Sequence, residues 1–305
     1  VQPVNHNILI NPSFTVKQYG DVIDHNEESF GPDRWQIRGV INIGGTMSQS
    51  STDSSSGTNK LVVKHRNATS FANTYQRIEA VNLLGLYGKE MTFSFSYSDV
   101  GGSGVPRIRI GSYGSSDNHK DLFEGVPTSL GDNRWTYTVT LTTADGTIPN
   151  PSEKGMHVVI YANEKNTAPS EWSVWETKLE AGSVATPFIA RSHGEELALC
   201  QRYYERIDVF RNTYLSIGMA WGPNAVRGVQ NYTEKRSGPA ISTTGDFISH
   251  RTGGTSVTFT APVTDGIRTK SVLLHQNVTG LNANTGDSIQ LTSSPDAYIE
   301  LDAEL

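Results

Sequence analysis

The sequence is poor in cysteine, with Cys200 as its one thiol among 305 residues. A single cysteine cannot form an intrachain disulfide, which excludes the disulfide-stapled class of secreted domains. Cys200 also lies among regularly spaced apolar residues, where a small buried side chain is expected rather than the accessible thiolate of a nucleophile. Disulfide stapling is therefore excluded, and cysteine catalysis is unsupported.

Basic charge and long apolar runs are also scarce. The chain has 25 Lys and Arg against 31 Asp and Glu, without a basic run, whereas a nucleic-acid-binding protein normally carries a basic patch. No apolar stretch approaches the roughly twenty residues that a membrane-spanning helix requires. We therefore expect neither nucleic-acid binding nor membrane insertion.

Motifs of catalysis and of metal binding are missing as well. The histidines are scattered, and no HExxH, CxxC, GxSxG or GxxxxGK[ST] pattern occurs. No catalytic residue and no metal ligand are assigned on this basis. The carboxylate pair of a polysaccharide-cleaving enzyme stays open, because its two members meet in space and the chain offers 31 acidic residues.

What the sequence has in abundance is alternation of apolar and polar residues. The clearest run is EMTFSFSYSDV, whose large side chains fall on one face of a strand: Met91, Phe93, Phe95 and Tyr97. Similar runs, divided by Gly, Asn, Asp and Ser clusters, are LVVKH, RWTYTVTLTT, GMHVVIYANE and EWSVWETKLE. Short strands at this spacing predict a β-sandwich over residues 1–190. The polar stretch SQSSTDSSSGTNK (48–60) is expected to be an exposed loop.

One segment, GEELALCQRYYERI, has a helical pattern instead. Its apolar residues recur at spacings of three or four and form a stripe that consists of Leu197, Cys200, Tyr204 and Ile207. Ser192 and Glu195 have the capping-box spacing, and Arg202 and Arg206 supply positive charge where a helix C-terminus favours it. The pattern predicts a linking helix over residues 191–208.

Strands resume after this helix, in YLSIGMAW, AVRGVQNY, TSVTFTAPV, SVLLHQNV, DSIQLTS and AYIELDAEL. They predict a second, smaller β domain over residues 209–305, in line with the two domains expected for a chain of this length. The predicted fold class is therefore all-β, with one short α-helix between two β domains.

The strand VPRIRIGSYG offers a candidate binding surface. Ile108 and Ile110 are expected to point inward, which places Arg107, Arg109 and Tyr113 together on the opposite face. If this face lies beside the serines of EMTFSFSYSDV, it is polar, cationic and aromatic, which suits an acidic glycan. The alternative is an ordinary solvated face.

A second candidate set lies in the C-terminal domain. Trp221, Tyr232, His250 and Arg251 fall in or near predicted turns, where loops carry binding residues on a rigid scaffold. Flat aromatic rings stack against sugar rings, and neighbouring polar groups hold hydroxyls. We therefore take these residues as candidate carbohydrate-binding residues at the tip of the domain.

Longer stretches of the sequence resemble bacteriophage tail fibre and tailspike proteins. LEAGSVATPFIARSHGEELALCQRYYERI and the final AYIELDAEL resemble a junction and an ending of that family, and LINPSFTV, PDRW and YQRIEAV fit its sandwich domain. The resemblance implies a jelly-roll sandwich, a helix that opens a small C-terminal β domain, and a homotrimer. It also implies a place at the distal tail fibre of the virion, where the protein touches a glycan of the host cell surface.

A homotrimer gives the helix stripe a role. Three copies around a three-fold axis can bury Leu197, Cys200, Tyr204 and Ile207 together. The alternative is a helix that packs on a sheet of its own chain, because one apolar stripe can face either partner.

The sandwich is also similar to jelly-roll carbohydrate-binding modules, many of which hold a structural calcium ion. In those modules an acidic residue follows an Asn-x-x-Phe start, whereas here Asn11-Pro12-Ser13-Phe14 is followed by Thr15, and Trp175-Glu176 stands where an acidic pair is expected. Ca²⁺ takes six to eight oxygen ligands, so the loss of even one weakens the site. No cofactor is expected, although structural calcium is compatible with the resemblance.

The function expected from the sequence is non-catalytic receptor binding by a phage tail fibre, with bacterial surface polysaccharide or lipopolysaccharide as ligand. Two alternatives stay open. One is a fragment of a polysaccharide depolymerase or lyase, and the other is a C-terminal module for trimerisation and folding.

Overall fold

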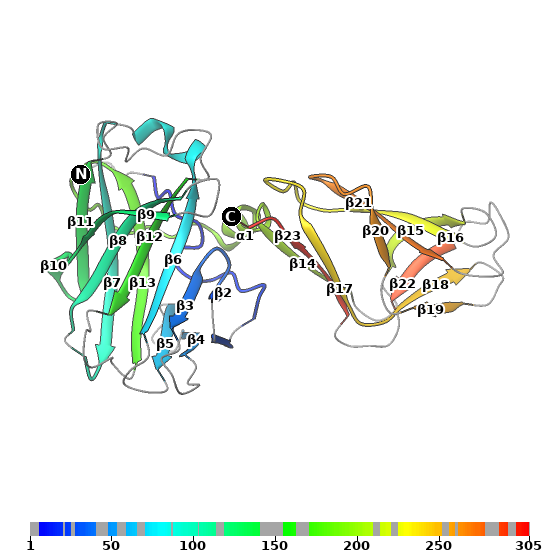
Figure 1. The fold of residues 1–305 in the computed structure, drawn as a ribbon, viewed down its shortest axis with the longest axis horizontal. Coiled ribbons are helices and arrows are strands. Elements are labelled where there is room, and N and C mark those ends of the chain that lie inside the picture. The colour runs from blue at the N-terminus through cyan, green and yellow to red at the C-terminus, as the bar shows by residue number, and fades with distance from the viewer. Residues whose placement is uncertain are drawn as a thin grey trace. The chain divides into compact units, whose positions relative to one another are not determined.

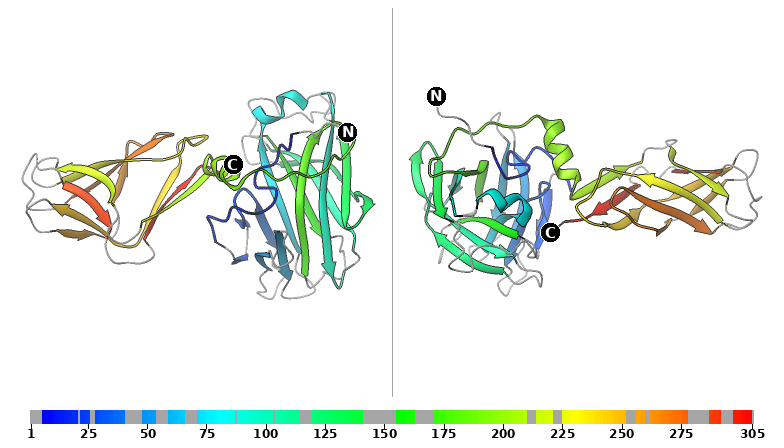
Figure 2. Two further views of the ribbon diagram at one scale, coloured as in Figure 1. Left: turned by 180° about the vertical axis from the view of Figure 1, so that it is seen from behind. Right: turned by 90° about the horizontal axis from the view of Figure 1, so that it is seen from above.

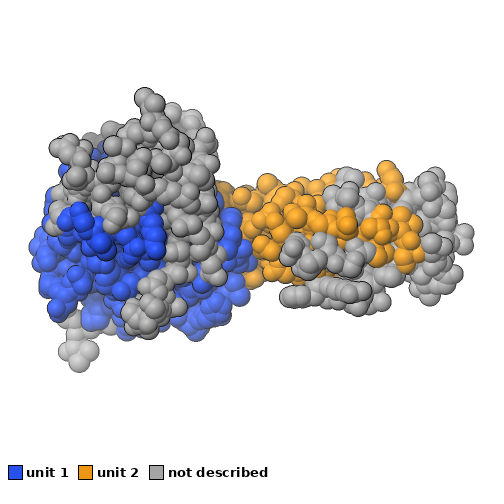
Figure 3. Space-filling view, turned by 90° about the horizontal axis from the view of Figure 1, so that it is seen from below, with its two compact units in different colours: residues 1–197, 305 blue, residues 198–304 orange. Residues whose placement is uncertain are grey.

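The computed structural model consists almost entirely of β-structure (Figure 1). It describes residues 6–20, 22–25, 28–40, 48–53, 59–65, 71–86, 88–102, 104–113, 119–140, 155–162, 171–209, 214–220, 225–251, 256–259, 262–277, 287–291 and 297–304. The chain divides into two compact units, Val1–Leu197 with Leu305 and Ala198–Glu304 (Figure 3). Among the described residues, no helix is long and apolar enough to cross a membrane.

Unit 1 is a sandwich of two antiparallel sheets that lie face to face (Figures 1 and 2). The seven-stranded sheet runs in the order β1 (Val22–His25), β4 (Ser48–Asp53), β5 (Lys60–His65), β13 (Glu171–Ala181), β7 (Glu90–Val100), β11 (Arg134–Thr140), β10 (Thr128–Gly131). The six-stranded sheet runs β2 (Glu28–Phe30), β3 (Gln36–Val40), β6 (Phe71–Glu79), β12 (Gly155–Ala162), β8 (Pro106–Tyr113), β9 (His119–Gly125). A 3-10 helix, η1 (Ala80–Leu86), follows β6.

The core of unit 1 lies between the two sheets and is built by alternation. Four side chains of β7 enter the core as predicted, and all are at most 1% exposed: Met91, Phe93, Phe95 and Tyr97. Ile108 and Ile110 of β8 meet them from the other sheet and are fully buried, also as predicted. Trp35 and Trp172 are fully buried in the same cluster. Burial of such large apolar surfaces is the main stabilising contribution.

One expectation about the sandwich is wrong. The segment 48–60 was expected to be a loop, but Ser48–Asp53 forms strand β4, which pairs with β1 on one side and β5 on the other. The strand is held by backbone hydrogen bonds to two neighbours rather than by an apolar face, so apolar alternation could not detect it.

Helix α1 (His193–Gln201) begins as the capping box predicts. Glu195 Oε2 accepts hydrogen bonds from the Ser192 amide (3.0 Å) and from its hydroxyl (2.7 Å), and the Glu195 amide reaches back to Ser192 Oγ. These hydrogen bonds lower the pKa of Glu195.

The helix ends earlier than predicted, and the expected extension to 208 is wrong. Tyr204 and Ile207 lie in strand β14 (Tyr204–Asp208), not on the helix. β14 pairs with β23 (Tyr298–Asp302), and the Ala303 amide donates to the Tyr203 carbonyl. Pairing with a segment almost a hundred residues away thus overrides a local helical pattern.

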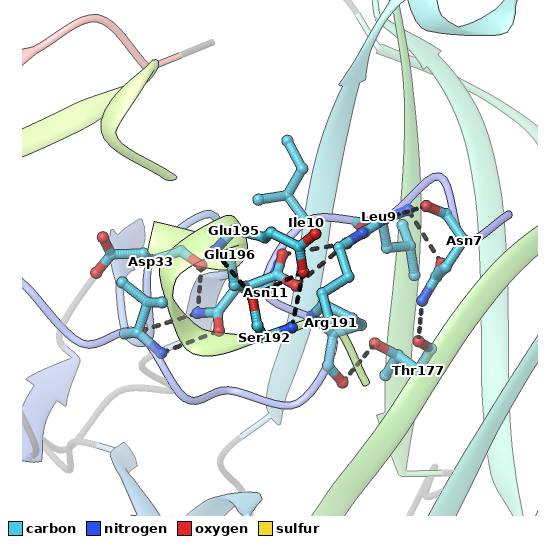
Figure 4. Close-up of polar contacts among 12 residues, drawn as sticks. Asn7, Leu9, Ile10, Asn11, Asp33, Thr177, Arg191, Ser192, Glu195 and Glu196 are labelled. Atoms are coloured by element: carbon cyan, nitrogen blue, oxygen red, sulfur yellow. Dashed lines mark hydrogen bonds and ion pairs between the residues drawn. The ribbon is translucent and has the colours of Figure 1, made fainter. Parts of the chain in front are cut away.

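A buried polar cluster fastens the N-terminal segment to the start of α1 (Figure 4). The Asn11 amide Nδ2 donates to the carbonyls of Val16 (2.8 Å) and Asp33 (2.9 Å), while its backbone amide donates to Glu196. Arg191 pairs with Glu196 at 3.2 Å and also donates to the carbonyls of Asn7 and Leu9. Asn11 has a φ of +52°, a conformation that asparagine tolerates better than most residues.

The segment between β13 and α1 is fastened to the outer face of the seven-stranded sheet (Figure 2). Glu180 is fully buried and accepts hydrogen bonds from the Thr186 amide (2.8 Å) and hydroxyl (2.5 Å). Lys178 lies 3.2 Å from Glu180 and donates to Thr186 Oγ1 and to the Pro187 carbonyl. We call residues 182–192 the strap.

Unit 2 contains two antiparallel sheets, one of three strands and one of seven. The first runs β14, β23, β17 (Ala240–Thr244). The second runs β19 (Val257–Phe259), β18 (Phe247–Arg251), β22 (Asp287–Leu291), β15 (Tyr214–Ala220), β16 (Ala225–Asn231), β21 (Ser271–Asn277), β20 (Val263–Asp265). Phe247, Ile299 and Leu301 are fully buried in the core of unit 2. The predicted class, all-β with a jelly-roll sandwich, a short helix and a smaller β domain, is confirmed.

Candidate functional site

The outer face of the six-stranded sheet of unit 1 carries the best candidate site. On its central strand β12, Val158 and Ile160 point into the core, so His157, Val159 and Tyr161 point outward. Val159 is paired with Tyr75 of β6 on one side and with Arg109 of β8 on the other. We call this surface the arginine–tyrosine face, and its outward residues are Gln36, Asn73, Tyr75, Arg77, Arg107, Arg109, Asp121, Glu124, His157, Val159 and Tyr161.

Aromatic rings form the floor of this face. Tyr75, Val159 and Tyr161 pack together as an apolar cluster that is separate from the main core. The guanidinium of Arg109 lies 5.7 Å from the ring centroid of Tyr161, and that of Arg77 lies 5.5 Å from the ring of Tyr75. Cation–π attraction at such distances holds the guanidinium groups over the rings.

Charged groups form the accessible layer above the rings. Glu124 lies 3.9 Å from Arg107 Nη2 and 3.6 Å from Arg109 Nη2, and Arg109 Nε lies 3.4 Å from Asp121. The Tyr161 hydroxyl donates to Glu124 at 2.5 Å. Burial, the hydrogen bond to Glu124 and the charge of Glu124 together raise the pKa of Tyr161 to about 12, so its hydroxyl remains a donor at neutral pH.

Several buried polar atoms on the face lack a hydrogen-bond partner within the described part of the chain. Two are acceptors, Gln36 Oε1 and Asn73 Oδ1, and one is a donor, Arg107 Nε, while Arg109 Nε has only the ion-pair contact with Asp121. Buried polar atoms are normally paired, so unpaired atoms of both kinds in one place single this face out as a candidate site.

Two of the three sequence-predicted residues of the sandwich lie on this face. Arg107 and Arg109 point outward from β8 with 25% and 28% of their side chains exposed. Tyr113 is the last residue of β8 and pairs with His119, but its side chain lies outside the described residues. Sequence reasoning missed Tyr75 and Tyr161, although their alternation with the core residues of β6 and β12 is visible once those strands are known to be neighbours.

The serines expected beside these arginines lie elsewhere. Ser94 and Ser96 belong to β7 in the seven-stranded sheet, where they accept hydrogen bonds from Arg134. Acidic residues of β9, Asp121 and Glu124, take the place beside the arginines instead. The polar neighbours of the face are therefore carboxylates rather than hydroxyls.

The described part of the structure does not show the candidate residues of the C-terminal unit as one group. Trp221 lies outside them, and His250 and Arg251 fall in β18 with side chains that are also outside. The Tyr232 hydroxyl donates to the carbonyls of Arg268 (2.5 Å) and Ser271 (3.0 Å). Tyr232 therefore has a structural role in its own unit.

The residues predicted for a trimer interface differ in how far they are buried. Cys200 and Tyr204 are 0% and 2% exposed within one chain, and the Tyr204 hydroxyl donates to Glu300 at 2.6 Å. Cys200 on α1 is thus buried within its own chain, and Tyr204 is buried from strand β14. Leu197 and Ile207 are only partly buried, so a trimer contact stays a prediction for them.

The residues at the expected calcium position do not fit the ion. The Pro12 carbonyl accepts hydrogen bonds from both the amide and the hydroxyl of Thr177, and the Glu176 carboxylate lies 4.0 Å from Arg134. The Asn11 side chain is occupied by backbone partners. Oxygens already bound to donors or paired with a cation cannot supply the six to eight ligands of Ca²⁺. Among the described residues, no group of three or more His, Cys, Asp or Glu could hold a metal ion.

Comparisons with known proteins find structural likeness without sequence likeness. No protein-family model matches the chain. No curated protein sequence matches it either. The solved structures similar to it include the enzymatically active domain of tailspike protein 4 of bacteriophage CBA120, at 10% identity and a TM-score of 0.32 over 58% of this chain and 21% of that chain. Others are the CBM22-1 xylan-binding domain of Paenibacillus barcinonensis Xyn10C (7% identity, TM-score 0.31, 61% of this chain and all of that chain) and a cyclase from Fischerella sp. TAU (15%, 0.38, 60% and all).

Proposed function

We propose that this chain is the receptor-binding part of a phage tail fibre, which attaches to bacterial surface polysaccharide or lipopolysaccharide without cleaving it. The arginine–tyrosine face of unit 1 is its glycan-binding surface. Three copies at the distal end of the fibre give weak single contacts a high combined affinity, because tethered sites raise the effective concentration of the next contact.

The observation that carries this proposal is the combination of groups on one sheet face. Arg107 and Arg109 supply donors and Glu124 supplies an acceptor, above the buried rings of Tyr75 and Tyr161. Sugars carry hydroxyls around their rings, and this arrangement offers both donors and acceptors to them. The tail-fibre setting rests on the sequence resemblance of the junction Leu179–Phe188 and of Cys200–Tyr204.

The experiment is retention of the purified chain on surface polysaccharide and lipopolysaccharide from candidate hosts, with polymer length followed in the same samples. Replacing Arg109 with Met removes the guanidinium but keeps the stem that covers Tyr161. We expect binding to fall about tenfold or more, since hydrogen bonds from charged groups contribute about 1.5–3 kcal/mol.

The matched control is Arg134→Met, which removes the guanidinium of a side chain that is 19% exposed on the other sheet of the same unit. Binding should be unchanged in this variant while it remains folded. Equal loss in both variants, or no loss in Arg109→Met, would contradict the assignment of the face. Shortened polymer would instead support the depolymerase alternative and would direct attention to the carboxylates.

A further inference from the structure

Two arginines of the arginine–tyrosine face, Arg107 and Arg109, are paired with carboxylates of the face itself. Arg109 is paired with both Asp121 (3.4 Å) and Glu124 (3.6 Å), and Arg107 shares Glu124 at 3.9 Å. These two cations therefore face two carboxylates. The positive charge of Arg107 and Arg109 is offset by Asp121 and Glu124 in the fold, which removes the reason that these two arginines gave to expect an acidic glycan.

The unpaired buried atoms on the same face give a second, independent indication. Gln36 Oε1 and Asn73 Oδ1 are acceptors and require a donor, whereas Arg107 Nε requires an acceptor. A carboxylate or phosphate accepts hydrogen bonds but donates none, so it can satisfy only the arginine. A hydroxyl both donates and accepts, and can satisfy all three.

We propose that the arginine–tyrosine face binds a neutral, hydroxyl-rich stretch of glycan and discriminates against acidic glycans. This inference rests on the proposed function and names the ligand class of its site. Glu124, 41% exposed, accepts hydrogen bonds from sugar hydroxyls and repels carboxylates and phosphates. Gln36 and Asn73 accept further hydroxyls through their side-chain oxygens.

The test measures binding of the full chain to two sets of polymers. The neutral set is mannan, dextran and xylan, and the acidic set is alginate, polygalacturonate and hyaluronate. Each is measured at about 0.05 M and about 0.5 M NaCl, because binding that depends on exposed opposite charges weakens as salt screens them. We expect retention by at least one neutral polymer, with less than about a twofold change between the two salt concentrations.

Glu124→Gln tests the discriminating residue, since it keeps the shape and removes the charge. We expect neutral binding to weaken about three- to tenfold, because hydrogen bonds to a charged acceptor are stronger, and acidic polymers to gain binding at low salt. Asn73→Leu should weaken neutral binding without any gain for acidic polymers. Glu171→Gln is the matched control. Glu171 is 35% exposed, lies on the other sheet and is paired with Lys64 at 3.4 Å, so loss of its charge should change neither neutral nor acidic polymer binding.

The outcomes separate this inference from the function on which it rests. Salt-sensitive binding of acidic polymers in preference to neutral ones, lost in Arg109→Met, would overturn the neutral-glycan inference and leave the glycan-binding face intact. Retention of neither set, or retention that is unchanged in both Arg109→Met and Asn73→Leu, would overturn the assignment of the face together with the inference.

Discussion

Removing the Glu180 carboxylate should destabilise unit 1 far more than the loss of an ordinary acidic residue. Glu180 is fully buried, holds both polar groups of Thr186 and neutralises Lys178, whose side chain is 2% exposed. In Glu180→Leu the ammonium of Lys178 remains buried without its counter-charge. Breaking a buried pair in this way costs about 3–5 kcal/mol of unfolding free energy.

The double variant Lys178→Met, Glu180→Leu separates charge from packing. With both charges removed, the Thr186 amide and hydroxyl and the Pro187 carbonyl lose a partner, which costs about 1–3 kcal/mol. The double variant should therefore be more stable than Glu180→Leu, by about 2 kcal/mol. Glu90→Leu, at an exposed position of β7, is the control and should stay within about 0.5 kcal/mol of the parent.

Urea unfolding followed by tryptophan fluorescence measures these changes in unit 1, because Trp35, Trp135, Trp172 and Trp175 lie there and Trp221 alone lies in unit 2. For a unit of this size, a loss of 3–5 kcal/mol lowers the melting temperature by roughly 10 °C. A Glu180→Leu variant within about 1 kcal/mol of the parent would refute the reasoning. A double variant as unstable as the single one would refute it as well.

Two further predictions concern buried polar side chains of unit 1. Burial, partly offset by hydrogen bonds from Gln18, raises the pKa of Asp33 from 3.8 to about 6. The neutral form is thus favoured by folding, so its contribution of about 3 kcal/mol is complete below pH 3.8 and is lost as the pH rises through about 6. Urea unfolding between these pH values should show this decline in the parent and not in Asp33→Asn; equal profiles would refute the assignment. Asn11→Ala leaves two carbonyls and the Val16 amide without their partner and should cost about 2–4 kcal/mol in the same assay, whereas a loss below about 1 kcal/mol would show that the cluster contributes little.

Much of the fold could be predicted from the sequence because its signals are local. Alternation places Met91 and Ile108 in the core, and the spacing of Ser192 and Glu195 marks the start of α1. Features set by distant partners could not be predicted in this way. The end of α1 depends on the pairing of β14 with β23, and polar β4 is a strand because β1 and β5 flank it.

The candidate site was only half predictable for the same reason. Arg107 and Arg109 are evident from one strand, because the isoleucines between them fix which way they point. Their partners Tyr161 and Glu124 belong to other strands, and the register that joins β8 to β12 and β9 brings them together. An acidic ligand was expected because the sequence of β8 shows Arg107 and Arg109 but does not show that Asp121 and Glu124 lie beside them.

In unit 1, most side chains of the stretches that resemble tail fibre proteins have a structural role, whereas the proposed site has a binding role. Asn11, Gln76, Glu180 and Thr186 come from those stretches, and their side chains bind the backbone or each other, which fastens the N-terminal segment and the strap to the sandwich. The arginine–tyrosine face takes Arg107, Arg109, Asp121 and Glu124 from β8 and β9, outside those stretches, whereas Tyr75 and Arg77 lie within YQRIEAV. A resemblance carried by fastening residues therefore transfers the scaffold and not the ligand. Ligand choice should accordingly change with substitutions on β8 and β9 while the fastening residues stay the same.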